Sequence, residues 1–371
     1  MRLNYQNLFW KKKEFVSFLL SILVFFIHSN FAQDSIKNSF ISTLNQKTSF
    51  FFSCSITQFA VPMFFILSGI SFFKEYNTKK YLTKIKSRLF TLVIPYLLWN
   101  TVWLLWEIFC SYSFVERFSA TDKPYPLTLT SILKGVFFHG CNGPFWFMFN
   151  LIVFSFAAPI VFLIIRNKYV SLIFIIGLSI SSLFGIHIPA TLFYYPNSII
   201  FYLIGAMIGY HYFDFVSKKS SKTTQIASIV FLLTYIFAKN IIPQEQLIDN
   251  YLIEVIVFTL CAFALWNIVD IFIERIKPRA IFRRSFAIYA MHLNVALIIL
   301  KLLSVLLPQN EWLEIPKFII MVILTLIIIN FVCNSLEKVF PKIYSLFMGN
   351  RINNPPNKSY RKRKCIIEKS R

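Results

Sequence analysis

The sequence predicts an all-α membrane protein, a polytopic bundle of about ten transmembrane helices. Of its 371 residues, 57% are hydrophobic and only 15% are charged, and the mean hydropathy is +0.62. The charged residues gather between long apolar runs, and a run of ~20 residues is enough for a helix to cross the hydrocarbon core. This composition lies far outside that of a soluble globular domain.

Ten apolar segments are predicted to span the membrane, and the charge pattern orients them. With a cytoplasmic N-terminus, the inner segments hold 30 of the 38 Lys and Arg residues, the outer segments hold seven, and Lys301 lies within the ninth span. This asymmetry follows the positive-inside rule and places both termini in the cytoplasm. The predicted spans are 14–32, 56–73, 89–111, 145–165, 169–186, 191–210, 225–241, 250–273, 282–307 and 316–335.

The chain divides into one membrane domain, 1–348, and a basic tail, 349–371, predicted to be disordered and cytoplasmic. The formal net charge of +22 points to anionic lipid headgroups as partners and not to nucleic acid, because Lys and Arg flank the spans and form no separate basic domain. The scattered cysteines show no metal-ligand spacing, so no metal site is predicted.

The first span carries one ionisable side chain in its interior, His28. The span begins at Glu14, directly after three lysines, and His28 lies ~22 Å further along the helix axis. A titratable ring at that depth is costly, which makes it a candidate functional residue. A histidine that packs between helices is the alternative. His292, in the ninth predicted span, is a second candidate of the same kind.

Two further stretches are candidates for a functional site, and each also has a purely structural explanation. Ser68 and Gly69 suit either a locally opened backbone at a cavity or a small-residue packing seam. Lys84, Lys86 and Arg88 stand at the predicted cytoplasmic mouth of the third span. They suit the phosphates of an anionic donor, or they anchor the helix by positive charge alone.

Taken in order, these motifs resemble the acyltransferase 3 family of bacterial integral membrane acyltransferases, over about residues 10–335. The family pattern has a first-helix histidine, Phe-Phe-x-x-Ser-Gly, a basic stretch leading to Pro-Tyr, Trp-Phe, and Ile-Tyr-x-x-His. The matching residues are His28, 64–69, 84–96, 146–147 and 288–292. One position departs: the family commonly has Arg or Lys eleven residues before the histidine, where this chain has Ser17.

The resemblance implies an O-acyltransferase of the bacterial inner membrane. It would move an acyl group, usually acetyl from acetyl-CoA, to a hydroxyl of a cell-surface polysaccharide or lipid-linked glycan, without a tightly bound cofactor. His28 would act as the general base or as a transient acyl carrier. The expected substrate-binding residues are Glu14, Ser68, Gly69, Lys84, Lys86, Arg88, Trp146, Tyr289 and His292.

The sequence also permits two other functions. A transporter or flippase of lipid-linked sugars would use the histidines for proton coupling, and ten spans with broken helices permit it. No repeat relates the two halves of the chain, however, and Glu107 and Glu254 are the main acidic candidates inside spans. An inactive relative serving as a scaffold is the third possibility, and Ser17 is its only support.

Overall fold

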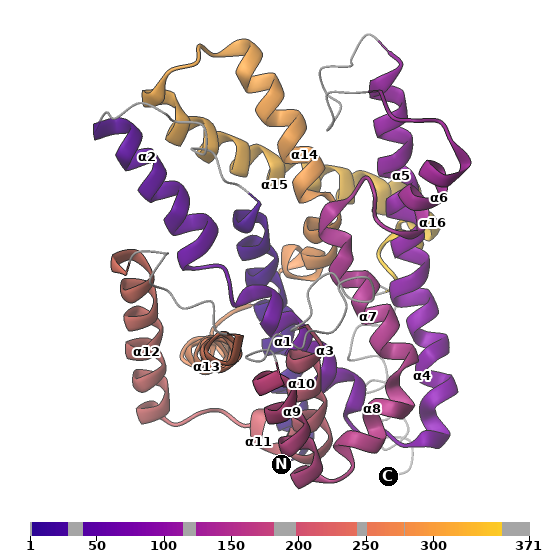
Figure 1. The fold of residues 1–371 in the computed structure, drawn as a ribbon, viewed down its shortest axis with the longest axis vertical. Coiled ribbons are helices and arrows are strands. Elements are labelled where there is room, and N and C mark those ends of the chain that lie inside the picture. The colour runs from indigo at the N-terminus through magenta and orange to yellow at the C-terminus, as the bar shows by residue number, and fades with distance from the viewer. Residues whose placement is uncertain are drawn as a thin grey trace.

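The computed structural model describes residues 2–28, 40–113, 124–181, 198–242, 251–277 and 279–350. Every regular element within these ranges is a helix (Figure 1), so the predicted all-α class is confirmed. The α-helices are α1 (Arg2–Ile27), α2 (Phe40–Phe50), α3 (Ala60–Phe73), α4 (Tyr81–Arg88), α5 (Ile94–Ser111), α6 (Leu129–Phe137), α7 (Trp146–Phe156), α8 (Ala158–Ile165), α9 (Lys168–Ser181), α10 (Ser198–His211), α11 (Phe213–Val216), α12 (Lys222–Ile241), α13 (Tyr251–Val269), α14 (Ser285–Leu306), α15 (Glu314–Val339) and α16 (Pro341–Phe347). Residues 351–371 of the predicted tail lie outside the described ranges.

Six described helical stretches are long and apolar enough to cross a membrane, so the predicted count of about ten is not confirmed. They are Phe40–Phe73, Thr78–Ser111, Lys222–Ile241, Tyr251–Val269, Ala280–Leu306 and Glu311–Val339. α9 and α10 are apolar but have only 14 residues each. α1 carries a cluster of four charged residues, 11–14, halfway along its length.

The predicted span 145–165 is broken. α7 and α8 together are apolar enough to cross the membrane, but they meet at a bend of 70°. Pro159 lies in the first turn of α8. Proline has no N–H to donate, and its ring clashes with the carbonyl four residues earlier, so a straight helix cannot run through it.

Two helical stretches extend beyond the spans that hydropathy predicts. Residues 40–55, which lie between the predicted spans 14–32 and 56–73, form α2 and a π-helical turn that lead into α3. Their Ser, Thr, Asn and Gln side chains lower the hydropathy without preventing a helix. Residues 78–88, which lie between the predicted spans 56–73 and 89–111, likewise continue through the π-helical turn Leu89–Val93 into α5, on one side of the bundle (Figure 1).

α3 and α10 pack with their backbones in close contact, and glycines make this possible. A Cβ atom on Gly69 would overlap the carbonyl oxygen of Tyr202, and one on Gly205 would overlap that of Ile66. Gly209 faces Ile70 in the same way. Small residues at such a seam allow van der Waals contact between two helix backbones in a membrane. The structure therefore places Gly69 in the packing seam.

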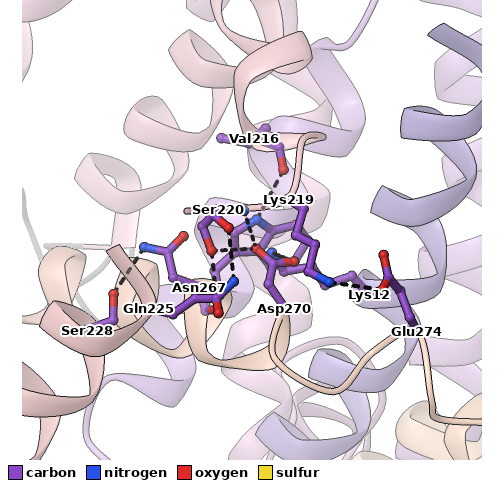
Figure 2. A network of polar contacts seen from close by, with 10 residues as sticks. Lys12, Val216, Lys219, Ser220, Gln225, Ser228, Asn267, Asp270 and Glu274 are labelled. Atoms are coloured by element: carbon purple, nitrogen blue, oxygen red, sulfur yellow. Dashed lines mark hydrogen bonds and ion pairs between the residues drawn. The ribbon is translucent and has the colours of Figure 1, made fainter. Parts of the chain in front are cut away.

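α1 runs through the middle of the bundle and contacts α3 and α14 (Figure 1). Near its charged cluster it is joined to the end of α13 by a buried ion pair. Lys12 Nζ lies 2.7 Å from Asp270 Oδ1, and both side chains are at most 2% exposed (Figure 2). Asp270 Oδ2 accepts hydrogen bonds from the Ser220 backbone N–H at 3.0 Å and hydroxyl at 2.9 Å. Lys12 Nζ also lies 4.2 Å from the centroid of the Trp266 ring. These contacts hold α1 against α13 and the segment before α12.

Candidate active site

A cavity of about 360 Å³ lies beside α1, bounded also by α3, α7 and the start of α14. Apart from Trp10, its α1 wall is polar: Lys13, Glu14, Ser17 and Ser21 follow helical spacing and so share one face of the helix. The other walls are mostly aromatic and aliphatic. A ligand with one anionic part and one apolar part matches this combination.

Three cations from three separate elements line the cavity. They are Lys13 of α1, Arg88 at the end of α4, and Arg283 of the 3₁₀ turn Ala280–Arg284. Among the described lining residues, Glu14 is the one carboxylate, and it interacts electrostatically with Arg283. The excess of positive charge makes this part of the cavity suitable for a phosphate-bearing ligand.

Contacts with α3 position two of these cations. Lys13 Nζ donates a hydrogen bond to Ser71 Oγ at 2.6 Å, and that hydroxyl donates to the Leu67 carbonyl at 2.6 Å. The central guanidinium carbon of Arg88 lies 5.2 Å from the centroid of the Phe72 ring, a cation–π distance. Both cations thus meet the same end of α3.

The other two basic residues of the predicted phosphate cluster do not line the cavity. The Lys84 ammonium donates to the carbonyl of Phe72 and, at 3.3 Å, to that of Lys74. It thereby satisfies carbonyls at the C-terminal end of α3, where the helix dipole favours a cation. Lys86 is exposed.

A second, smaller pocket of about 90 Å³ contains His28. The exposed imidazole lies just beyond the last residue of α1, and Trp146 at the start of α7 lines the same pocket. Phe64, Phe147 and Tyr289 line both the pocket and the large cavity, so the two spaces share a wall. This arrangement brings the cation-bearing cavity next to the His28 ring.

His292 lies next to His28. The ring centroids are 5.5 Å apart, and His292 is fully buried. Its Nδ1 lies 2.8 Å from the Tyr289 carbonyl and 3.1 Å from that of Ile288, and because carbonyls only accept, Nδ1 carries the proton. Nε2 therefore holds a lone pair, and among the described residues it has no hydrogen-bond partner. The site contains two neighbouring imidazoles, one of which is fixed in a known tautomer.

Tyr289 joins the two spaces and is rigidly held. Its hydroxyl donates to the Pro144 carbonyl at 2.6 Å. Its ring stacks on Phe145 with centroids 5.4 Å apart and an interplanar angle of 3°. The turn Gly143–Phe145 before α7 is thereby fastened to α14. The hydroxyl is occupied by this contact, so Tyr289 presents its ring to the cavities.

The structure brings together most of the predicted site residues. Glu14, Ser68, Arg88 and Tyr289 line the large cavity, His28, Trp146 and Tyr289 line the small pocket, and His292 adjoins His28. Gly69, Lys84 and Lys86 lie elsewhere. Lys13 and Arg283 also line the large cavity but are not among the predicted site residues. Both belong to basic clusters that positive-inside anchoring also accounts for. For Lys13 alone, the sequence offers a further indication: it lies four residues before Ser17 and so on the same helix face.

A family model described as an acyltransferase domain matches residues 16–331, which is most of the chain. The match contains His28, His292 and two of the three cavity cations, Arg88 and Arg283. No curated protein and no solved structure matches significantly. The helices long and apolar enough to cross a membrane agree with an integral membrane member. The chain therefore belongs to the acyltransferase 3 family and is a membrane acyltransferase.

Proposed function

We propose that the protein is an O-acyltransferase of the bacterial inner membrane. It moves an acyl group, acetyl in the simplest case, from acyl-CoA to a hydroxyl of a cell-surface polysaccharide or lipid-linked glycan. One observation carries this proposal: a cavity with three cations shares a wall with a pocket that contains His28. The family match favours neither the transporter nor the scaffold.

The large cavity receives the donor. Acyl-CoA combines phosphate groups with a long uncharged arm, and the cavity combines Lys13, Arg88 and Arg283 with apolar walls. Lys and Arg form charge-assisted hydrogen bonds to phosphate oxygens, and these are about twice as strong as neutral ones. In this proposal Arg283 and Lys13 supply the positive charge that Ser17 lacks. Lys86, being exposed, only adds to the attraction of the donor to this side.

His28 acts as the general base. The imidazole takes the proton of the acceptor hydroxyl, and the oxygen attacks the thioester carbonyl. The carbon–sulfur bond then breaks, the sulfur leaves as a thiolate, and the proton held by His28 passes to it. The products are the O-acyl ester and CoA, so every atom of the donor and acceptor is accounted for.

His292 supports this step from behind. Its Nδ1 proton is held by two backbone carbonyls, which fixes the ring. Its buried Nε2 lone pair is available to accept a hydrogen bond from His28 or from the acceptor hydroxyl. The exposed edge of His28 leaves room for the acceptor to reach it.

Mass spectrometry of surface glycans tests the proposal. Cells with the gene are expected to carry glycans heavier by one acyl group per modified hydroxyl than cells in which it is deleted. Membranes from the same cells are expected to release CoA thiol from acetyl-CoA only when the protein is present. Identical glycans and identical thiol release in the two strains would contradict the proposed reaction.

Moving the positive charge within the cavity tests the donor site. Arg283→Ala is expected to raise the apparent KM for acetyl-CoA about 10-fold, since one charge-assisted hydrogen bond contributes about 1.5–3 kcal/mol. Ser17 lines the same cavity, so Ser17→Arg in the Arg283→Ala background is expected to restore most of the affinity. Steady-state rates of thiol release at varied acetyl-CoA give both values.

Arg279→Ala is the matched control. Arg279 is exposed and precedes the 3₁₀ turn that carries Arg283, so its loss removes the same charge without touching the cavity. The apparent KM of this variant for acetyl-CoA is expected to stay within about twofold of the wild-type value, because an exposed charge contributes little. Equal effects of the Arg279 and Arg283 variants would show that only the net charge of this side matters.

A further inference from the structure

Two consecutive arginines in the 3₁₀ turn before α14 make contacts in different parts of the protein. Arg283 lines the cation-bearing cavity, whereas the guanidinium of Arg284 lies against the end of α15. A 3₁₀ helix has three residues per turn, so consecutive side chains are about 120° apart around its axis. The same turn therefore carries one cation for the cavity and one that binds a neighbouring helix.

Arg284 is fixed by acceptors from successive turns of α15. The residue is only 6% exposed. Its Nη2 donates to Asn334 Oδ1 at 2.6 Å, and its Nη1 donates to the Asn330 carbonyl at 3.2 Å and to the Asn330 side-chain oxygen. Glu337 lies 3.7 Å from Nη2, but that carboxylate is 46% exposed. Because hydrogen bonds from a charged donor are the strong ones, they fasten the turn to α15.

The opposite side of the turn is packed against α1. The Phe282 ring lies 5.1 Å from Phe15 and 5.2 Å from Phe18, measured between ring centroids. Directly after the turn, the Ser285 carbonyl lies 3.0 Å from the Ser21 hydroxyl of α1. The turn is thus held between α1 and α15.

We propose that Asn334 is a positioning residue, which holds Arg284 and thereby keeps Arg283 directed into the cavity. This inference rests on the proposed function, in which Arg283 binds the phosphates of acyl-CoA. Asn334 lies beyond the residues that the family model matches, 16–331, and lines neither described space. A displacement of about 1 Å is enough to weaken the action of a positioned group. The end of α15 therefore contributes to donor affinity without touching the donor.

Substitutions at Asn334 and Arg284 test the inference. Membranes with each variant are assayed for thiol release at varied acetyl-CoA. Asn334→Leu is expected to raise the apparent KM about 5-fold, part of the effect of losing Arg283, while kcat stays within about twofold of the wild-type value. Asn334→Asp keeps an oxygen acceptor and is expected to retain the wild-type KM. Arg284→Lys loses the planar fork that reaches both acceptors, so it is expected to raise KM as well.

Phe331→Leu is the matched control. Phe331 lies on α15 one turn before Asn334, is 69% exposed and has no contact with Arg284, so leucine there is expected to leave KM unchanged.

A double variant shows whether Asn334 acts through Arg283. In the Arg283→Ala background, Asn334→Leu is expected to change KM by less than about twofold, because two substitutions that disable the same group do not add. A residue with a general role in folding would lower activity in either background.

Two results overturn the inference while leaving the proposed function intact. One is a wild-type KM in both Asn334→Leu and Arg284→Lys, measured where Arg283→Ala raises it. The other is an effect of Asn334→Leu that adds in full to that of Arg283→Ala, or that lowers kcat and leaves KM unchanged. If wild-type membranes release no thiol from acetyl-CoA, the proposed function itself fails, and the inference fails with it.

Discussion

Replacing His28 with alanine is expected to lower acyl transfer by about 10²- to 10⁴-fold, the usual contribution of a general base. The residue lies just beyond the end of α1 and is exposed, so the substitution removes little packing. The amount of protein in the membrane is expected to be unchanged. The rate of CoA thiol release from acetyl-CoA, normalised to the amount of membrane protein, measures the effect.

A histidine outside the candidate site supplies the control. His139 lines neither described space and has a positive backbone φ of 51°, a conformation that asparagine tolerates well. His139→Asn is therefore expected to keep at least about half of the wild-type rate, as substitutions away from the site usually do. A His28→Ala protein with wild-type activity would remove this imidazole from the mechanism, whatever its position in the pocket.

Breaking the buried ion pair is expected to have the largest effect on stability. Asp270→Ala leaves the Lys12 ammonium in place with its side chain only 2% exposed. An uncompensated buried charge costs about 3–5 kcal/mol, so the free energy of unfolding is expected to fall by that amount. Titration with a denaturing detergent in mixed lipid–detergent micelles measures it.

An exposed pair in the same network is the matched control. Lys219 and Glu274 lie 2.9 Å apart, with side chains 40% and 64% exposed (Figure 2). Lys219→Ala is expected to change the free energy of unfolding by less than about 1 kcal/mol, because solvent screens such pairs. The double variant Lys12→Met/Asp270→Leu is expected to recover most of the stability lost in Asp270→Ala, since neither charge remains. A stable Asp270→Ala protein would show that the pair is not needed to hold α1.

Local sequence patterns identified some residues of the cation-lined cavity and misplaced others. Arg88 was predicted and lines the cavity, whereas Lys84, four residues away, instead caps the carbonyls at the end of α3. The two residues have the same charge and belong to one basic stretch before an apolar segment, so no pattern in the sequence separates them. Their roles differ because the C-terminal end of α3 lies beside Lys84, and this contact between two separate helices is not written in either local sequence.

Arg283 illustrates the same limit over a longer distance. It lies 270 residues after Lys13, and each belongs to a basic cluster next to an apolar segment. Positive-inside anchoring accounts for both clusters, so the sequence contained no separate signal that they meet. The packing of α1 against the 3₁₀ turn before α14 brings them to one cavity.

The sequence by itself determined the all-helical class, the membrane setting and the family, because composition, hydropathy and short ordered motifs are local properties. It also indicated His28 and His292 as candidate site residues, since an ionisable ring in an apolar run stands out without any knowledge of its neighbours. Only the tertiary structure decided which cations share a cavity, that Gly69 lies in a packing seam, and that Phe64, Phe147 and Tyr289 line both the cavity and the His28 pocket. These features depend on contacts between distant helices, and side-chain periodicity along one helix does not encode its partner.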